Sequence, residues 1–177
     1  MTVNKYDEML MAFKRATVMV LGTMCDENDV THEMLSDSPE TVTGDIIGVM
    51  GLSNEITTGT AVVAFPQNLA EKIISSMSGF EVEELSKFDI NDGITEFLNM
   101  ICGNAKSLLA NTEFAFNLSV PIIFTSKKFM IGYHHNTMVF NIRFTLPESQ
   151  FHLLVSFKEN PAEAGMKYNM VGKQKTV

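Results

Sequence analysis

The sequence predicts an α+β protein with a single, largely antiparallel sheet packed against helices. Helical periodicity comes first in the chain, then a hairpin, a short helix and a long helix, and finally several strand-like segments with short loops. Such tight connections favour antiparallel pairing, and the helices are expected on one or both faces of the sheet. The 177 residues are 45% hydrophobic and 19% charged, which suits one domain, or at most two small ones, with a packed core.

The first half of the chain supplies a helix and a hairpin. Apolar residues recur at helical spacing from about Asn4 to Leu21, which predicts a helix. The polar, acidic stretch Asp26–Glu40 is interpreted as a loop. The segments Asp45–Ser53 and Thr57–Phe65 are rich in β-branched and other apolar residues, with Ser53-Asn54-Glu55 between them, and they predict a hairpin.

Two helices and a group of strands are expected after the hairpin. Asn68 is expected to cap a short helix that continues to Met77 and ends at Gly79. The longest helix is expected from about Asp92 to Ala110. Strand-like composition then returns in five segments, Glu113–Ser119, Ile122–Ser126, Lys128–His134, Thr137–Leu146 and Phe151–Phe157, with turns at His135-Asn136 and Pro147-Glu148. We expect a folded domain over residues 1–160 and a polar tail over 161–177.

Composition excludes several classes of protein. Lys and Arg number 13 against 21 acids, and the net charge of -8 argues against a nucleic-acid-binding protein. The two cysteines, Cys25 and Cys102, are too few for a disulfide framework. No secretory signal and no apolar run of about 18 residues is visible, so we expect a cytoplasmic location without a membrane span. His134 and His135 are adjacent and would point to opposite faces of a strand, so no metal site is predicted.

The long helix has an apolar face and an unusual polar face. At about 100° per residue, one broad apolar stripe contains Ile94, Phe97, Leu98, Ile101, Cys102, Ala105, Leu108 and Leu109. Asp92, Glu96, Asn99 and Gly103 lie on the opposite side. Such a face is most often only solvated. However, Asn and Gly are poor residues for a helix interior, and Gly costs about 1 kcal/mol relative to Ala. A missing side chain also lets another molecule approach closely.

The spacing of these residues resembles the signature of the CheC/CheX/FliY family of chemotaxis phosphatases. The match consists of Asp92-x3-Glu96-x2-Asn99, with Gly103 four residues later and Pro121 22 positions after Asn99. The order of elements is similar to that family from about Tyr6 to Phe157, which implies a CheC-like fold. Pro121 lies between two strand-like segments and is interpreted as structural, at a bend or an edge.

The resemblance is strongest to CheX within this family. CheC-like proteins have a second Glu-x2-Asn, whereas here Glu8 is followed three residues later by Met11, and Glu71 by Ile74. FliY is longer and has an added flagellar-switch domain. A CheX-like protein is expected to be a homodimer. The chain departs from the family at Leu98, because a Gly commonly precedes the Asn.

The resemblance implies a phosphatase for the aspartyl phosphate of CheY-like response regulators, in chemotaxis or other two-component signalling. Asn99 would orient the attacking water, because a carboxamide can hold a water but is too weak a base to deprotonate it. Glu96 would pair with a Lys of the phosphorylated receiver domain, and Asp92 and Gly103 would shape the contact surface. Mg2+ would be bound by the regulator, with no cofactor on this chain.

Two other interpretations remain open. In the first, the chain is a non-catalytic protein of the same fold that binds a receiver domain or a partner subunit, with Leu98 displacing Asn99 from a productive position. In the second, it is a dimeric scaffold in which the motif is incidental. The mutations Glu96→Ala and Asn99→Ala separate these interpretations, because they test docking and turnover respectively.

Overall fold

The computed structural model describes residues 6–35, 41–126, 129–133 and 135–160, and it contains three α-helices and an antiparallel sheet of seven strands. The sheet order is β1-β8-β9-β4-β3-β5, and β6 also pairs with β3. The expected tail 161–177 lies outside the described residues. The helices are α1 (Asp7–Met24), α2 (Gln67–Ser78) and α3 (Lys87–Leu108). The sheet strands are β1 (Thr31–Leu35), β3 (Ile46–Ser53), β4 (Thr57–Phe65), β5 (Asn117–Leu118), β6 (Ile122–Thr125), β8 (Met138–Leu146) and β9 (Ser149–Glu159).

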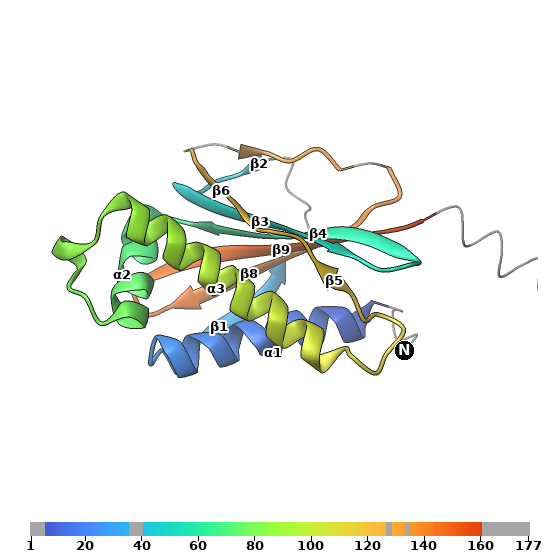
Figure 1. Ribbon diagram of the computed structural model, residues 1–177, viewed down its shortest axis with the longest axis horizontal. Helices are drawn as coiled ribbons and strands as arrows, with labels where there is room; N and C mark the ends of the chain where they lie inside the picture. Colours follow the sequence, from blue (N-terminus) through green and yellow to red (C-terminus); the bar gives the residue numbers. More distant parts are fainter. Residues whose placement is uncertain (1–5, 36–40, 127–128, 134, 161–177) are drawn as a thin grey trace, which may run out of the picture.

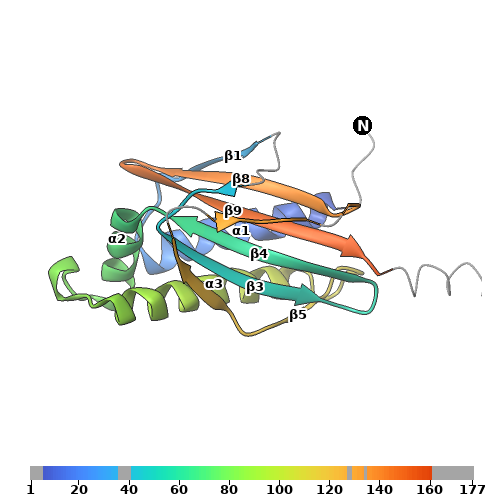
Figure 2. The same ribbon diagram turned by 90° about the horizontal axis from the view of Figure 1, so that it is seen from above.

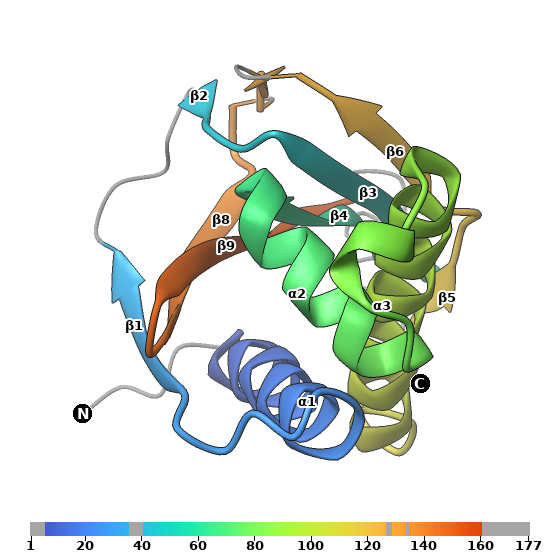
Figure 3. The same cartoon turned by 90° about the vertical axis from the view of Figure 1, so that its left-hand side faces the viewer.

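All three helices cover the same face of the sheet (Figures 1 and 3). The main core lies between the helices and the sheet. It includes Phe13 of α1, Phe97 of α3 and Phe151 of β9, each fully buried. On the other face, a smaller cluster forms around Ile47 and Leu154. A short ribbon of β2 (Thr41–Val42) and β7 (Phe129–Met130) also lies on that side (Figure 1). The α+β prediction is confirmed, and one helical layer builds the core.

The predicted hairpin is confirmed. β3 and β4 pair in register from Ile46↔Phe65 to Ser53↔Thr58. The Asn54 carboxamide oxygen accepts hydrogen bonds from the backbone N–H groups of Ile56 and Thr57 and closes the turn. β4 also pairs with β9, so the hairpin lies in the middle of the sheet (Figure 2).

Both predicted helices after the hairpin begin earlier than expected. Pro66 is the N-cap of α2, so Asn68 lies inside the helix and does not cap it. The C-terminal prediction is confirmed, because Gly79 adopts the left-handed conformation, with φ of 75°. α3 begins at Lys87 and not near Asp92. Ser86 and Asp89 form a capping box, in which each side chain accepts the other's backbone N–H.

The interpretation of Asp26–Glu40 as a loop was wrong in part, because Thr31–Leu35 forms strand β1 at the edge of the sheet. The side chains of this strand are mostly exposed, so no alternation of apolar residues marked it. It pairs with β8, and Glu33 forms an ion pair with Arg143 across the two strands. Residues 36–40 of the same prediction lie outside the described residues.

Two of the segments expected as strands after α3 form shorter strands than predicted. Only Asn117–Leu118 of the segment Glu113–Ser119 is a strand. Phe114 lies in a turn and Phe116 in the loop after it, and both reach the core from there and not from a ladder. Of Lys128–His134, residues 129–130 form β7, while residues 128 and 134 lie outside the described residues. The turn predicted at Pro147-Glu148 is confirmed. No helix in the described residues is long and apolar enough to cross a membrane.

Pro121 lies where the edge of the sheet is interrupted. β5 and β6 both pair with β3, and the ladder breaks between them, opposite Met50 and Gly51. The Ser119 hydroxyl accepts the backbone N–H of Gly51 at 2.8 Å at this break. Because Pro lacks an N–H group, it is tolerated at such an edge. The structural role predicted for Pro121 agrees with this position.

Candidate functional site on helix α3

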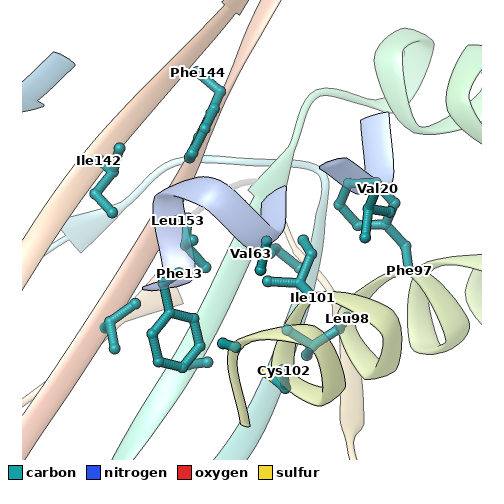
Figure 4. Packing of buried hydrophobic residues seen from close by; sticks show 14 of the residues in the cluster. Phe13, Val20, Val63, Phe97, Leu98, Ile101, Cys102, Ile142, Phe144 and Leu153 are labelled. Atoms are coloured by element: carbon teal, nitrogen blue, oxygen red, sulfur yellow. The ribbon is translucent and has the colours of Figure 1, made fainter. Parts of the chain in front are cut away.

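The buried face of α3 fixes how the helix lies on the sheet. The ring of Phe97 meets those of Phe65 and Phe151 edge to face, with centroid distances of 5.5 and 6.1 Å. Figure 4 shows Phe97, Leu98, Ile101 and Cys102 together with residues of α1 and the sheet. The apolar stripe read from the sequence is confirmed at Ile94, Phe97, Leu98, Ile101, Cys102, Ala105 and Leu109.

Leu108 was assigned wrongly to that stripe, because its side chain is 41% exposed. It is the last residue of α3, and the chain turns immediately after it. Leu109, in the C-cap position, is buried instead. A helical wheel assumes that the helix and its neighbours continue, and that assumption fails at a helix end.

The opposite side of α3 carries the four residues predicted for the site. Asp92 and Glu96 are exposed, and Asn99 and Gly103 are half-buried. Spacings of four, three and four residues place them on one surface of the helix. We call this surface, made of Asp92, Glu96, Asn99 and Gly103, the motif face. Asp92 lies in the second turn of α3 and not at the helix start, where the predicted boundary placed it.

Glu96 and Asn99 have side chains that are free to contact another molecule. In the part of the chain that the structure describes, neither side chain forms a hydrogen bond or an ion pair. Residues three apart on a helix have Cβ atoms about 5–6 Å apart. A carboxylate that can pair with a cation therefore lies next to a carboxamide that can both donate and accept hydrogen bonds. This arrangement can hold a cationic side chain and a water side by side.

The two glycines of α3 have opposite surroundings. A methyl group added at Gly93 would come within 2.6 Å of Ile74 Cδ1, so this glycine allows α2 to pack closely. A methyl group added at Gly103 would meet no heavy atom within 4 Å. The helix therefore gains no packing from the glycine at 103, although Gly lowers helix stability by about 1 kcal/mol relative to Ala. The open surface next to Asn99 is accessible to a partner.

Leu98, next to Asn99, fits the core of this chain. Its side chain is fully buried, and it packs over Gly48 of β3. A methyl group added at Gly48 would come within 3.3 Å of Leu98 Cδ2 and 3.1 Å of Val63 Cγ2. The glycine in the strand thus leaves the space that the leucine of the helix fills. Leu98 points into the core, away from the surface on which Asn99 lies.

The titratable groups with shifted pKa values lie outside the motif face. Burial raises the pKa of the Cys102 thiol to about 12 and, together with Glu27, that of Cys25 to about 11. Both cysteines are free and buried, as predicted for Cys102. Hydrogen bonds from Ser86 lower the pKa of Asp89. Among the described residues, no three His, Cys, Asp or Glu side chains gather closely enough to hold a metal ion.

Two hollows of the surface lie away from the motif face. One of about 420 Å3 contains Asp45, Gln150 and His152 in its lining, and one of about 560 Å3 contains Asn136 and Lys158. Desolvation, followed by repulsion from Arg143, lowers the pKa of His152, and its ring nitrogen Nδ1 lies 3.1 Å from the Asn141 carboxamide oxygen. Neither hollow includes a motif-face residue. The candidate site is thus an exposed helix surface, suited to a macromolecular partner.

The structure also shows what the sequence prediction missed. The predicted helix start near Asp92 excludes the first turn of α3, which contains Phe88. Phe88 is 77% exposed and lies four residues before Asp92, in line with the motif face. The spacing Ser86-x2-Asp89 resembles a capping box and was the signal that could have placed the helix start correctly.

Solved structures of chemotaxis proteins have the same fold. CheX from Vibrio vulnificus matches with a TM-score of 0.76 and 24% identity, over 85% of this chain and 99% of that one. A CheC-like superfamily protein from Shewanella sp. PV-4 matches with a TM-score of 0.75 and 22% identity, over 88% and 99%. The CheX–CheY–BeF3–Mg2+ complex from Borrelia burgdorferi matches with a TM-score of 0.66 and 17% identity, over 85% and 97%.

The family match is independent of these structures. No curated protein matches the sequence. The model of the family described as chemotaxis phosphatase CheX matches residues 46–145, which include the central hairpin, α2, α3 and the whole motif face. The chain therefore belongs to the CheX family of chemotaxis phosphatases.

Proposed function

We propose that this protein hydrolyses the aspartyl phosphate of a CheY-like receiver domain, with Asn99 orienting the attacking water and Glu96 docking the receiver. The observation that carries the proposal is a pair of polar side chains on the exposed face of α3 that have no partner among the described residues. They lie next to the open surface at Gly103, in a chain of the CheX family. The solved CheX–CheY–BeF3–Mg2+ complex shows that a CheX protein of this fold binds CheY.

The reaction requires no covalent catalysis by a side chain of this protein. The water oxygen bonds to phosphorus as the bond between phosphorus and the aspartyl oxygen breaks, which yields an aspartate carboxylate and phosphate. One water proton passes to the phosphate product. Catalysis of such a step depends mainly on holding the water in line and on neutralising charge on the phosphoryl oxygens. The Asn99 carboxamide serves the first need by accepting a hydrogen bond from the water.

Glu96 and the receiver would supply the rest of the site. The carboxylate of Glu96 pairs with a Lys beside the phosphoaspartate and fixes the depth to which Asn99 enters. Mg2+ held by the receiver's own acidic pocket neutralises the phosphoryl oxygens, so this chain contributes no metal ligand. Asp92 and Gly103 form the surrounding contact surface. The buried position of Leu98 over Gly48 supports this assignment, because a side chain that points into the core leaves the motif face clear.

We expect the protein to act as a homodimer in the cytoplasm, where response regulators are found. The edge strand β1 has β8 on one side and no strand on the other in the described part of the chain, so its free edge is a candidate dimer seam. Light scattering coupled to size-exclusion chromatography tests the dimer, and a monomeric mass at micromolar concentration would contradict it.

The test of the function is phosphate release from a phosphorylated, Mg2+-loaded CheY-type receiver, with and without this protein. We expect acceleration by the wild type and a loss of about 100-fold or more in Asn99→Ala, as is typical when one positioned polar group is removed. Asn104→Ala is the matched control, because Asn104 is a half-buried Asn on the same helix but off the motif face. Binding of the receiver by Asn99→Ala should stay close to that of the wild type.

Different results would favour the other interpretations. Binding of the activated receiver without acceleration by the wild type would identify a non-catalytic receiver-binding protein. Equal activity of Asn99→Ala and wild type would place the chemistry elsewhere. If Glu96→Gln and wild type bind receivers equally well, Glu96 has no role in docking.

A further inference from the structure

Phe88, in the first turn of α3, is a large apolar side chain that the fold leaves in solvent. Its side chain is 77% exposed, whereas Ile90, two residues later, is only 4% exposed and belongs to the core. Packing against the described residues therefore gives no reason for an aromatic residue at position 88. Burying a phenylalanine contributes about 1.5–3 kcal/mol, so Phe88 can supply binding free energy that the folded chain leaves unused.

The position of Phe88 on the helix continues the motif face. Phe88 is four residues before Asp92, which in turn is four before Glu96, so the three side chains follow one line along α3. At 1.5 Å per residue, the line from Phe88 to Gly103 is about 22 Å long. A standard interface buries about 800 Å2 per partner, which is a patch about 30 Å wide. One partner of domain size can therefore cover Phe88 and the motif face together.

The segment before α3 adds to the apolar surface and is held in place by capping. Phe80 and Val82 are 58% and 38% exposed. They precede α3 within the connection from α2, where Glu81 and Glu84 form one capping box and Ser86 and Asp89 form the next. Such hydrogen bonds restrict the connection before any partner arrives, which lowers the ordering cost of binding.

The charge around Phe88 indicates the kind of partner. Residues 80–96 contain six acidic residues, Glu81, Glu83, Glu84, Asp89, Asp92 and Glu96, and one basic residue, Lys87, and all seven are exposed. An apolar anchor within an acidic surface is complementary to a partner surface with an apolar hollow and basic side chains around it. The Lys that a receiver domain would offer to Glu96 is one such basic side chain.

We propose that Phe88 is the docking anchor for the receiver domain, inserting into an apolar hollow beside the phosphorylation site while Phe80 and Val82 line the rim. This inference rests on the proposed function, because it assumes that the motif face meets a receiver. Phe88 contributes affinity and orientation and takes no part in the chemical step. It therefore acts on binding of the receiver and not on the rate of hydrolysis in the bound complex.

The test compares three substitutions at position 88 with a matched control. Phe88→Ala and Phe88→Ser remove the anchor, and Phe88→Leu keeps a large apolar side chain. Met11→Ala is the control, since Met11 is 59% exposed near the start of α1, and α1 begins at the end of the helical layer where α3 finishes (Figure 1). Calorimetry gives the Kd for a receiver activated with beryllofluoride and Mg2+, and phosphate release gives kcat and KM.

We expect Phe88→Ala and Phe88→Ser to raise both Kd and KM about tenfold or more, which is the effect of removing an interface anchor. Their kcat should remain within about twofold of wild type, because the chemical step keeps Asn99. Phe88→Leu should recover most of the affinity, and Met11→Ala should bind like the wild type. Unfolding midpoints should agree among all variants, because both side chains are exposed.

The failure of this inference is distinct from the failure of the proposed function. If Phe88→Ala keeps the wild-type Kd and KM while Asn99→Ala is inactive, the anchor is wrong and the phosphatase assignment stands. A fall in kcat without a change in KM would also overturn the anchor. If the wild type neither binds nor dephosphorylates any receiver, the proposed function and the anchor fail together.

Discussion

The two faces of α3 differ in whether their side chains contact the rest of the chain. On the buried face, Phe97, Leu98 and Ile101 are each 0% exposed and contact several elements of the core. On the motif face, Glu96 and Asn99 have no side-chain partner in the described residues, and Gly103 faces open space. The buried face is accounted for by the stability of this chain alone. Contacts among the described residues do not account for the motif face, which the proposed function assigns to a receiver domain.

The same contrast appears within one residue type. Gly93 is required because Ile74 occupies the space that a side chain at position 93 would need. Gly103 has free space around it. A glycine in the interior of a helix costs about 1 kcal/mol relative to Ala. At position 93 the close packing of α2 compensates for this cost. At position 103 no described residue compensates for it, and the proposed contact with a receiver domain would give this glycine a function.

The largest effect is expected at the centre of the buried face. Phe97→Ala removes a ring that contacts those of Phe65 and Phe151, and it should lower the free energy of unfolding by about 3–5 kcal/mol. Glu96→Ala, one residue away on the other face, should change it by less than about 0.5 kcal/mol. Urea denaturation measures both. Similar losses in the two variants would contradict the division of α3 into two faces.

A smaller effect is expected at the contact between α2 and α3. Gly93→Ala places a methyl group within 2.6–2.8 Å of three atoms of Ile74, whose side chain is only 2% exposed. Overpacking of this kind costs about 1–3 kcal/mol, which exceeds the gain of about 1 kcal/mol in helix propensity. We expect a net loss of about 1 kcal/mol in urea denaturation. A Gly93→Ala variant as stable as the wild type would contradict this close contact between α2 and α3.

The buried thiol of Cys102 should make the stability of the folded protein depend on pH. Because its pKa is about 12 in the folded protein and 9.0 otherwise, the folded state holds the proton more tightly than the unfolded state. Its contribution to stability is therefore complete below pH 9 and is lost as the pH rises from 9 towards 12. The loss is about 1.4 kcal/mol per pH unit in that range.

The check is urea denaturation of wild type and Cys102→Ala from pH 8 to 10. The contribution of Cys25 is common to both proteins, so the difference in slope belongs to Cys102. We expect the stability of the wild type to fall more steeply with pH. Parallel curves would mean that the thiol at 102 is accessible to water.

The smallest effect has the opposite sign and concerns the motif face. Gly103→Ala adds a methyl group that meets nothing within 4 Å, so it should raise the free energy of unfolding by up to about 1 kcal/mol. The same methyl group should weaken binding of the activated receiver, because it occupies space that the partner needs. A stabilised variant with unchanged affinity would remove Gly103 from the contact surface and leave the other residues of the motif face in question.

Local signals in the sequence predicted the central elements well. The hairpin of β3 and β4 was predictable because β-branched residues fill both strands and Asn54 supplies turn chemistry between them. The core stripe of α3 was predictable because seven buried positions repeat at helical spacing. The edge strand β1 was not, because its side chains are mostly exposed and its pairing with β8 joins segments more than 100 residues apart.

The sequence by itself determined the order of elements, the buried face of α3 and the spacing of the motif, because these depend on residue types and on the periods of helix and strand. Only the tertiary structure decided that all three helices cover one face of the sheet and that Phe88 faces solvent. It also decided that Ile74 occupies the space beside Gly93, whereas the space beside Gly103 is open. These features depend on which distant segments meet. A helical wheel gives the direction of a side chain, but it does not show what lies there.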